Sequence, residues 1–382
     1  MTTSDAATST DAIAPGKSHY VILDGLRGVA SLLVVVFHLF EAWAGNDPQK
    51  QIINHGYLAV DFFFLLSGFV IAYAYDDRWG RMSQWDFYKR RLIRLQPMVV
   101  VGSVIGAALF VFQQSGIFPK AAGTSWWYVV IVMLLGCVMI PLPKSGDLRG
   151  WDEIYPLNGP AWSLFYEYLA NIAYALGVRR LSNRWLGLLV AAAAVALVVL
   201  LVAGKRGDLI GGWALDRDGI TIGLVRVTFP FFAGVLLMRL GKRIRVPGAF
   251  WWCSLLLVAA LSLPRFGGTT HLWVNGLFEA ACVILLFPLI VAIGAGDRQA
   301  DGASVRIARF FGDLSYPLYI THYPLIYIYT AWVIDRKIAP AEGALAGAGL
   351  VVAAVVLAYA SLKLIDEPIR RRLAARFLRS AA

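Results

Sequence analysis

The stretch YVILDGLRGVASLLVVVFHLFEAW, from Tyr20 to Trp43, is apolar over most of its length but carries Asp24, Arg27 and His38. An apolar run of this length is typical of a membrane-spanning helix. At about 100° and ~1.5 Å per residue, Arg27 and His38 lie within roughly 20° on one helical face and ~16 Å apart. Ionisable side chains inside a membrane are costly and usually mark a functional site. We therefore expect chemistry on this face; the alternative is that Asp24 pairs with Arg27 while His38 bonds a neighbouring helix.

The composition of the whole chain indicates a membrane protein. Of its 382 residues, 59% are hydrophobic and 15% are charged, which is too apolar for a soluble protein of this length. The expected fold class is all-α, a polytopic integral membrane helix bundle. The net charge of +11 is then an excess of Lys and Arg in loops, so no nucleic-acid partner is expected. The three cysteines are widely separated and lie in apolar runs, so we expect neither a disulfide framework nor a metal site.

Eleven apolar runs are candidate membrane spans, at approximately 22–44, 57–75, 96–112, 126–142, 159–177, 186–203, 220–238, 250–266, 274–294, 308–333 and 343–366. Cytoplasmic loops collect Lys and Arg. The Lys- and Arg-rich loops between the apolar runs all lie on one side of the membrane only if one run between Arg94 and Asn158 does not cross it. We assign that role to Trp126 to Leu142, which opens with paired tryptophans. The sequence thus predicts about ten transmembrane helices plus one re-entrant or interfacial segment, with both termini cytoplasmic. The alternative is that all eleven runs cross.

One bundle is expected from residue 20 to residue 372, in the cytoplasmic (inner) membrane. Residues 1–19 are small and polar and are predicted to form a disordered cytoplasmic tail, and residues 373–382 a basic cytoplasmic tail. The sequence Ala42-Trp43-Ala44 has the form of a signal-peptide cleavage site. Cleavage there would discard Asp24, Arg27 and His38, and the polar tail is long for a signal layout, so we favour the uncleaved interpretation.

Four further ionisable residues lie inside apolar runs: Asp61, Glu167, Arg226 and His322. Asp61 is about one turn inside the second run, and Glu167 and Arg226 lie about 10 Å inside the external ends of theirs. We therefore expect these three side chains to converge with His38, and Arg226 to pair with Glu167 or Asp61. His322 is near the midplane, where Pro324 frees a backbone carbonyl for a polar neighbour. The alternatives are that Asp61 caps a loop turn and that His322 is a packing element.

A basic segment, FYKRRLIRLQP from Phe87 to Pro97, precedes the third apolar run and carries Arg90, Arg91 and Arg94. Arg91 and Arg94 are three residues apart and share a helical face, so they could grip a phosphate-bearing ligand at the cytoplasmic mouth. The alternative is that these cations only orient the helix or contact anionic membrane lipids.

Six blocks in this order resemble the membrane acyltransferase-3 family, which O-acylates cell-surface carbohydrates and other acceptors. They are LDGLRG with Arg27-x10-His38, GYLAVDFFFLLSGF, RRLIRLQP, PAWSLFYE, Arg226 ahead of FFAG, and GDLSYPLYITHYP. The resemblance covers Tyr20 to Arg372 and implies a ten-helix bundle. Unlike longer family members, this sequence has no esterase-like domain after Pro368, so transfer is expected to finish within the bundle or in a partner.

The resemblance implies an acyltransferase that uses acyl-CoA, most simply acetyl-CoA, as donor and a carbohydrate or lipid-linked sugar as acceptor. Arg27, Arg91 and Arg94 match the family positions associated with the donor, and His38 matches the catalytic histidine. We favour His38 as general base, oriented by Asp61 or Glu167, with Arg226 stabilising an oxyanion or a carboxylate. A covalent acyl-histidine is the alternative.

Two rival functions follow from the same residues. A transporter or flippase would use the intramembrane charges as a substrate and proton pathway, and internal inverted repeats would favour it, but none is evident. A membrane scaffold is disfavoured by the number of intramembrane charges.

Overall fold

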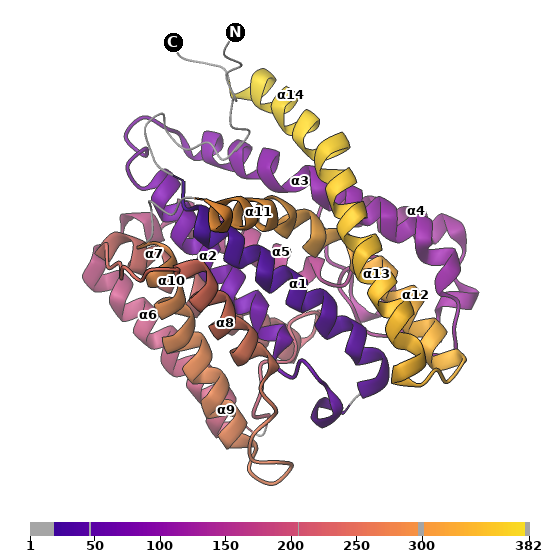
Figure 1. Cartoon of the computed structure of the whole chain (residues 1–382). Coiled ribbons are helices and arrows are strands. Elements are labelled where there is room, and N and C mark those ends of the chain that lie inside the picture. Colours follow the sequence, from indigo (N-terminus) through magenta and orange to yellow (C-terminus); the bar gives the residue numbers. More distant parts are fainter. Residues whose placement is uncertain (1–18, 46, 205, 297–301, 379–382) are drawn as a thin grey trace.

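The computed structural model describes residues 19–45, 47–204, 206–296 and 302–378, and these residues contain helices and no β-strand. The predicted tail at 1–19 lies outside the described residues except for His19. Figure 1 shows the helices packed side by side in one bundle, with α1 near its centre. The helices are α1 (Val21–Ala44), α2 (Ala59–Tyr75), α3 (Gln84–Leu109), α4 (Trp126–Cys137), α5 (Ala161–Leu176), α6 (Asn183–Val198), α7 (Arg217–Leu240), α8 (Ala249–Ser262), α9 (Leu272–Ala281), α10 (Phe287–Gly294), α11 (Ala303–Thr321), α12 (Tyr323–Asp335), α13 (Pro340–Ser361) and α14 (Glu367–Phe377).

Seven helical segments in the described part of the chain are long and apolar enough to cross a membrane. Three of the seven contain a π-helical turn: α6 continues through one to Ala203, α9 runs through one into α10, and α13 runs through one into α14. The all-helical membrane architecture predicted from the sequence is therefore confirmed, whereas the count of ten crossings stays a prediction. α14 extends the last helix to Phe377, into the segment that we predicted as a basic tail.

The segment predicted to be re-entrant or interfacial forms the short helix α4. Its 12 residues span only about 18 Å, less than the hydrocarbon thickness of a bilayer. Trp126 and Trp127 stand exposed at its first turn with their rings stacked. Amphipathic rings in such a place suit the level of the lipid headgroups.

The run predicted as one span at 308–333 is not one continuous helix, because the chain bends at His322 and forms two helices, α11 and α12. Pro324 has no N–H to donate to the carbonyl of Ile320 four residues earlier. That carbonyl instead accepts a hydrogen bond of 2.8 Å from Nδ2 of Asn158, in the loop before α5. The carbonyl that we expected Pro324 to free is therefore satisfied by a polar neighbour. His322 lies at the bend between the two helices.

Close approach between helices depends on glycine at two contacts. A Cβ atom added to Gly28 in α1 would lie 2.2 Å from the backbone oxygen of Phe311 in α11. A Cβ atom added to Gly68 in α2 would lie 1.8 Å from the backbone oxygen of Phe231 in α7. Small residues allow helix backbones to approach closely in membranes. α1 with α11, and α2 with α7, thus form tightly packed pairs, and these pairs carry Arg27, His38, Asp61 and Arg226.

Candidate functional site

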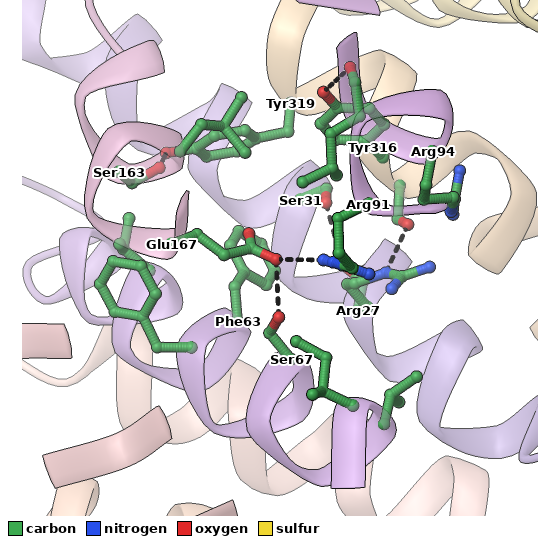
Figure 2. A pocket seen from close by; sticks show the side chains of 17 residues that line it. Arg27, Ser31, Phe63, Ser67, Arg91, Arg94, Ser163, Glu167, Tyr316 and Tyr319 are labelled. Carbon is green, nitrogen blue, oxygen red and sulfur yellow. Dashed lines mark hydrogen bonds and ion pairs between the residues drawn. The ribbon is translucent and has the colours of Figure 1, made fainter. Parts of the chain in front are cut away.

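The arginine pocket is a cavity of about 90 Å³ between α1, α2, α3, α5 and α11, drawn in Figure 2. Three guanidinium groups line it, from Arg27, Arg91 and Arg94, together with the carboxylate of Glu167. Arg91 and Arg94 point to the same cavity because they lie one turn apart on α3. Arg90 is not among the residues that line this pocket, so the structure does not place it with the other arginines.

Polar neighbours hold two arginines of the pocket, Arg27 and Arg91. Arg27 donates from Nε to the Ser315 hydroxyl at 2.9 Å and lies 3.3 Å from Asp24, the pairing that the sequence offered as an alternative. Arg91 donates to Glu167 at 2.9 Å, and the same Glu167 oxygen accepts from Ser67 at 2.6 Å. Figure 2 shows Glu167 reaching between Arg91 and Ser67. A cluster of cations with one carboxylate keeps a net positive charge, which suits phosphate or another anion.

The histidine cavity is a second and larger hollow, of about 490 Å³, lined by His38, Glu41, Tyr323 and residues of the loops before α5 and α7. Nδ1 of His38 lies 2.6 Å from Oε2 of Glu41, one turn further along α1. The His38 ring meets the Tyr323 ring edge to face at 4.6 Å and stacks on the His322 ring at 5.5 Å. Within the described residues, Nε2 of His38 has no hydrogen-bond partner, so this nitrogen is available to a ligand.

His322 is completely buried behind His38. Its Nδ1 lies 3.0 Å from the backbone oxygen of Leu318 and 2.9 Å from that of Tyr319, so Nδ1 carries the proton and donates to them. Nε2 of His322 is then an acceptor, and in the described part of the chain it has no partner. His322 thus presents an unprotonated ring nitrogen close to His38, whose ring centre lies 5.5 Å from its own.

Asp61 and Arg226 form a buried ion pair at the wall of the histidine cavity. Nε and Nη2 of Arg226 donate to the two carboxylate oxygens of Asp61, at 3.2 and 2.7 Å. The guanidinium also donates to the backbone oxygens of Tyr57 and Gly211, and it lies 5.0 Å from the ring of Trp162. Asp61 is thus the partner of Arg226, which is one of the two pairings that we expected. An arginine has five N–H donors, and these bonds occupy most of them.

A shared wall separates the arginine pocket from the histidine cavity, because Val60 and Tyr319 line both. The Tyr319 hydroxyl is fixed by Ser163, at 2.8 Å, and by the backbone oxygen of Pro160, at 3.2 Å. The rings of Phe63 and Tyr319 meet edge to face, with 5.4 Å between their centres. The two hollows are therefore neighbours, one with cations and the other with an imidazole.

Two geometric expectations from the sequence are wrong. Glu167 does not converge with His38, because it lies in the arginine pocket against Arg91. Asp61 does not orient the imidazole, because its carboxylate is occupied by Arg226. The carboxylate at His38 belongs to Glu41, which sequence reasoning missed although the spacing of three residues places both on one helical face.

The loop between α4 and α5 brings further groups to the histidine cavity, among them Trp151, Asp152 and Glu153. Glu153 is buried and accepts hydrogen bonds from the Tyr327 hydroxyl at 2.7 and 2.6 Å. Burial raises the pKa of this carboxyl to about 8, and the nearby charge of Arg149 opposes the increase. No local spacing in the sequence points to Glu153, because its contacts come from a helix more than a hundred residues away.

Comparison with known proteins identifies a family and several relatives of this chain. Residues 20–362 match a family model described as "Acyltransferase domain". "O-acetyltransferase OatA" of Staphylococcus aureus is 23% identical over 373 residues, and the match covers 92% of this chain and 57% of that protein. The chain therefore spans little more than half of that relative's length. "Acyltransferase MdmB" of Streptomyces mycarofaciens is 27% identical, over 80% of this chain and 78% of its own.

"Protein 2 in picA locus" of Rhizobium radiobacter is 34% identical over 187 residues, which cover 47% of this chain and 93% of that protein. No solved structure matches this chain.

Proposed function

Because the chain belongs to the family of the acyltransferase domain, and is an acyl-transferring membrane enzyme, we propose that it moves an acyl group from cytoplasmic acyl-CoA to a hydroxyl of a carbohydrate or lipid-linked sugar. Acetyl is the simplest acyl group for this reaction. The arrangement of the two hollows supports the proposal. The arginine pocket offers cations to the CoA phosphates, and the histidine cavity beyond Val60 and Tyr319 offers an imidazole to the acceptor.

In this proposal Arg27, Arg91 and Arg94 hold the donor, and Glu167 holds Arg91 in position. For the thioester to reach His38, the long and narrow pantetheine arm must pass the wall formed by Val60 and Tyr319. Arg226 and Asp61 hold α2 against α7 and keep the cavity wall in place. The acceptor stands on the other side of His38, among the side chains of the loops.

His38 acts as the general base. With its Nδ1 proton held by Glu41, the imidazole has a lone pair on Nε2. Nε2 takes the proton of the acceptor hydroxyl while the hydroxyl oxygen bonds to the thioester carbonyl carbon. The carbon–sulfur bond then breaks, and the proton passes from Nε2 to the departing CoA thiolate. The ester and free CoA are the products, and His38 returns to its starting state.

The decisive experiment gives the purified chain radiolabelled acetyl-CoA and a panel of glycans. We expect His38→Ala to reduce label transfer by about a hundredfold or more, because general-base catalysis contributes that much, while CoA binding is retained. Arg91→Ala and Arg94→Ala, unlike His38→Ala, are expected to weaken CoA binding. Movement of a substrate that is independent of acyl-CoA would instead support a transporter, and full activity of His38→Ala would refute the proposed base.

A further inference from the structure

The arginine pocket and the histidine cavity meet at one narrow wall. Of the residues that the structure describes, only Val60 and Tyr319 line both hollows. The two side chains are 6% and 5% exposed, so little open space is left beside them. Within the proposed function, the acyl group that reaches His38 must therefore pass between Val60 on α2 and Tyr319 on α11.

Contacts at both ends of its side chain fix the ring of Tyr319 across this passage. The hydroxyl is bonded to Ser163 and to the backbone oxygen of Pro160, and the ring packs against Phe63. Figure 2 shows the hydroxyls of Ser163 and Tyr319 turned towards each other at the edge of the arginine pocket. A ring held in this way keeps one orientation, so it forms a fixed wall.

The opposite side of the passage is held by a buried ion pair. Asp61 follows Val60 directly in α2, and its carboxylate is bonded to Arg226 on α7. Gly68, further along α2, brings this helix against the backbone of α7. A shift of Val60 away from the passage would pull Asp61 from its partner, and breaking a buried ion pair is costly. Val60 is therefore the rigid side of the passage.

The backbone that carries Tyr319 lies between two prolines. Pro317 is inside α11, and Pro324 is in the first turn of α12. Each proline lacks the N–H that would bond to the carbonyl four residues earlier, so fewer helical hydrogen bonds hold this part of the chain. We therefore expect Tyr319 to yield by a small shift that admits an unbranched chain. A wider group requires the ring to leave Ser163.

From these observations we infer that Val60 and Tyr319 select the donor by the width of its acyl group. Unbranched acyl groups pass, and groups that branch next to the thioester carbonyl are excluded. The inference rests on the proposed function, because it specifies the donor of that reaction. The end of CoA that carries the sulfur is itself an unbranched chain, so an acyl group of the same width follows the path that this arm must occupy. A quaternary carbon is wider and would overlap closely packed side chains.

Two unreactive donor analogues test this inference: S-propyl-CoA and S-neopentyl-CoA, in which a CH₂ group replaces the thioester carbonyl. Their binding to the full chain in lipid nanodiscs is measured by calorimetry, with CoA itself as the reference. We expect S-propyl-CoA to bind more tightly than CoA, because its alkyl group is buried. S-neopentyl-CoA is expected to bind about tenfold more weakly than S-propyl-CoA. Without a limit on width, its two additional methyl groups would make it the tighter ligand.

Val60→Ala and Tyr319→Leu widen the passage from opposite sides, and each is expected to reduce the difference to about twofold or less. Val235→Ala is the matched control, because Val235 is a buried valine of α7 that lines neither hollow, and it should keep the difference. Ser163→Ala frees the Tyr319 hydroxyl and is expected to reduce the difference by a few-fold, about the value of one hydrogen bond. Ser163→Thr keeps the hydroxyl and should retain the difference.

Equal binding of the two analogues to the unmodified chain would overturn the inference, as would a difference that persists in both widened variants. An alkyl group that adds nothing to the binding of CoA would overturn it too. CoA binding identifies a variant that has not folded, and the other widened variant then decides. Transfer from propionyl-CoA to glycans is measured separately. Discrimination by width without transfer would contradict the proposed function and leave the inference standing, whereas transfer without discrimination would do the reverse.

Discussion

At the scale of single residues, the contact between His38 and Glu41 decides which nitrogen of the imidazole can act on a substrate. The Glu41 carboxylate is 2.6 Å from Nδ1, so it selects the tautomer with the proton on that nitrogen. We expect Glu41→Gln to lower kcat by about tenfold or more while the KM for acyl-CoA is unchanged, because the donor binds in the other pocket. Steady-state kinetics of label transfer check this result.

Two further variants distinguish positioning by Glu41 from a general structural role. Glu41→Asp is expected to restore part of kcat, since it keeps the carboxylate. Glu342→Gln removes an exposed glutamate elsewhere and should have wild-type kinetics. Equal losses of kcat in Glu41→Asp and Glu41→Gln would contradict the assignment.

Glu153 makes the stability of the fold depend on pH. Its pKa is raised from the ordinary 4.5 to about 8 by burial, against the charge of Arg149, so the folded state keeps a proton that the unfolded state has lost. This contribution to stability is fully present below about pH 4.5 and is lost as pH rises through 8. We expect the free energy of unfolding to fall more steeply between pH 5 and 8 in the wild type than in Glu153→Gln, which mimics the protonated group. Thermal unfolding in detergent at several pH values measures the difference, and parallel curves would refute it.

At the scale of elements, the contact between α2 and α7 supports the Asp61–Arg226 pair. Gly68 lets the two backbones touch, because a Cβ atom there would lie 1.8 Å from the Phe231 oxygen. Gly68→Ala must push the helices apart, so we expect a loss of about 1–3 kcal/mol of stability.

Gly187→Ala in α6 is the matched control. No atom lies within 4 Å of the added Cβ, and alanine favours a helix by about 1 kcal/mol. Detergent or denaturant unfolding of both variants checks the prediction, and equal stability of the two would contradict it.

Sequence reasoning predicted the apolar helices well because hydrophobic runs of membrane length are a local signal. It gave Asp61 as one of two possible partners of Arg226, since a buried charge needs a partner. It gave the pairing of Asp24 with Arg27 only as an alternative. It placed Glu167 beside His38 from depth alone, but depth along a helix does not say which neighbour the side chain faces. Glu167 turns towards Arg91 on α3 instead.

The bend at His322 could not be predicted for a related reason. An apolar run from 308 to 333 is long enough for one helix, and a proline inside such a run is compatible with a kinked helix. Which outcome occurs depends on Asn158, which satisfies the freed carbonyl of Ile320 from another part of the chain. The contacts of Glu153 are likewise tertiary, with Tyr327 as donor.

At the scale of the whole molecule, α1 carries both halves of the proposed reaction. Its first part presents Arg27 to the arginine pocket, and His38 further along faces the histidine cavity. The proposed function requires the arginine pocket on the cytoplasmic side, where acyl-CoA is made, and the loop at Glu153 on the opposite side. The topology of the chain is therefore a test of the proposal, and α4 is the segment that decides it.

If α4 does not cross the membrane, both of its flanks lie on the external side. Gly123 and Ser145 are exposed on either side of α4, so each can be changed to cysteine with little disturbance. Cys137→Ser first removes the one native cysteine that is not buried. We expect a membrane-impermeant maleimide to label both Gly123→Cys and Ser145→Cys in intact cells. Gly80→Cys, in the basic loop between α2 and α3, is the control and should react only after permeabilisation. Labelling of the two flanks from opposite sides would make α4 a crossing and restore eleven spans, and the arginine pocket and the loop at Glu153 would then need a new assignment of sides.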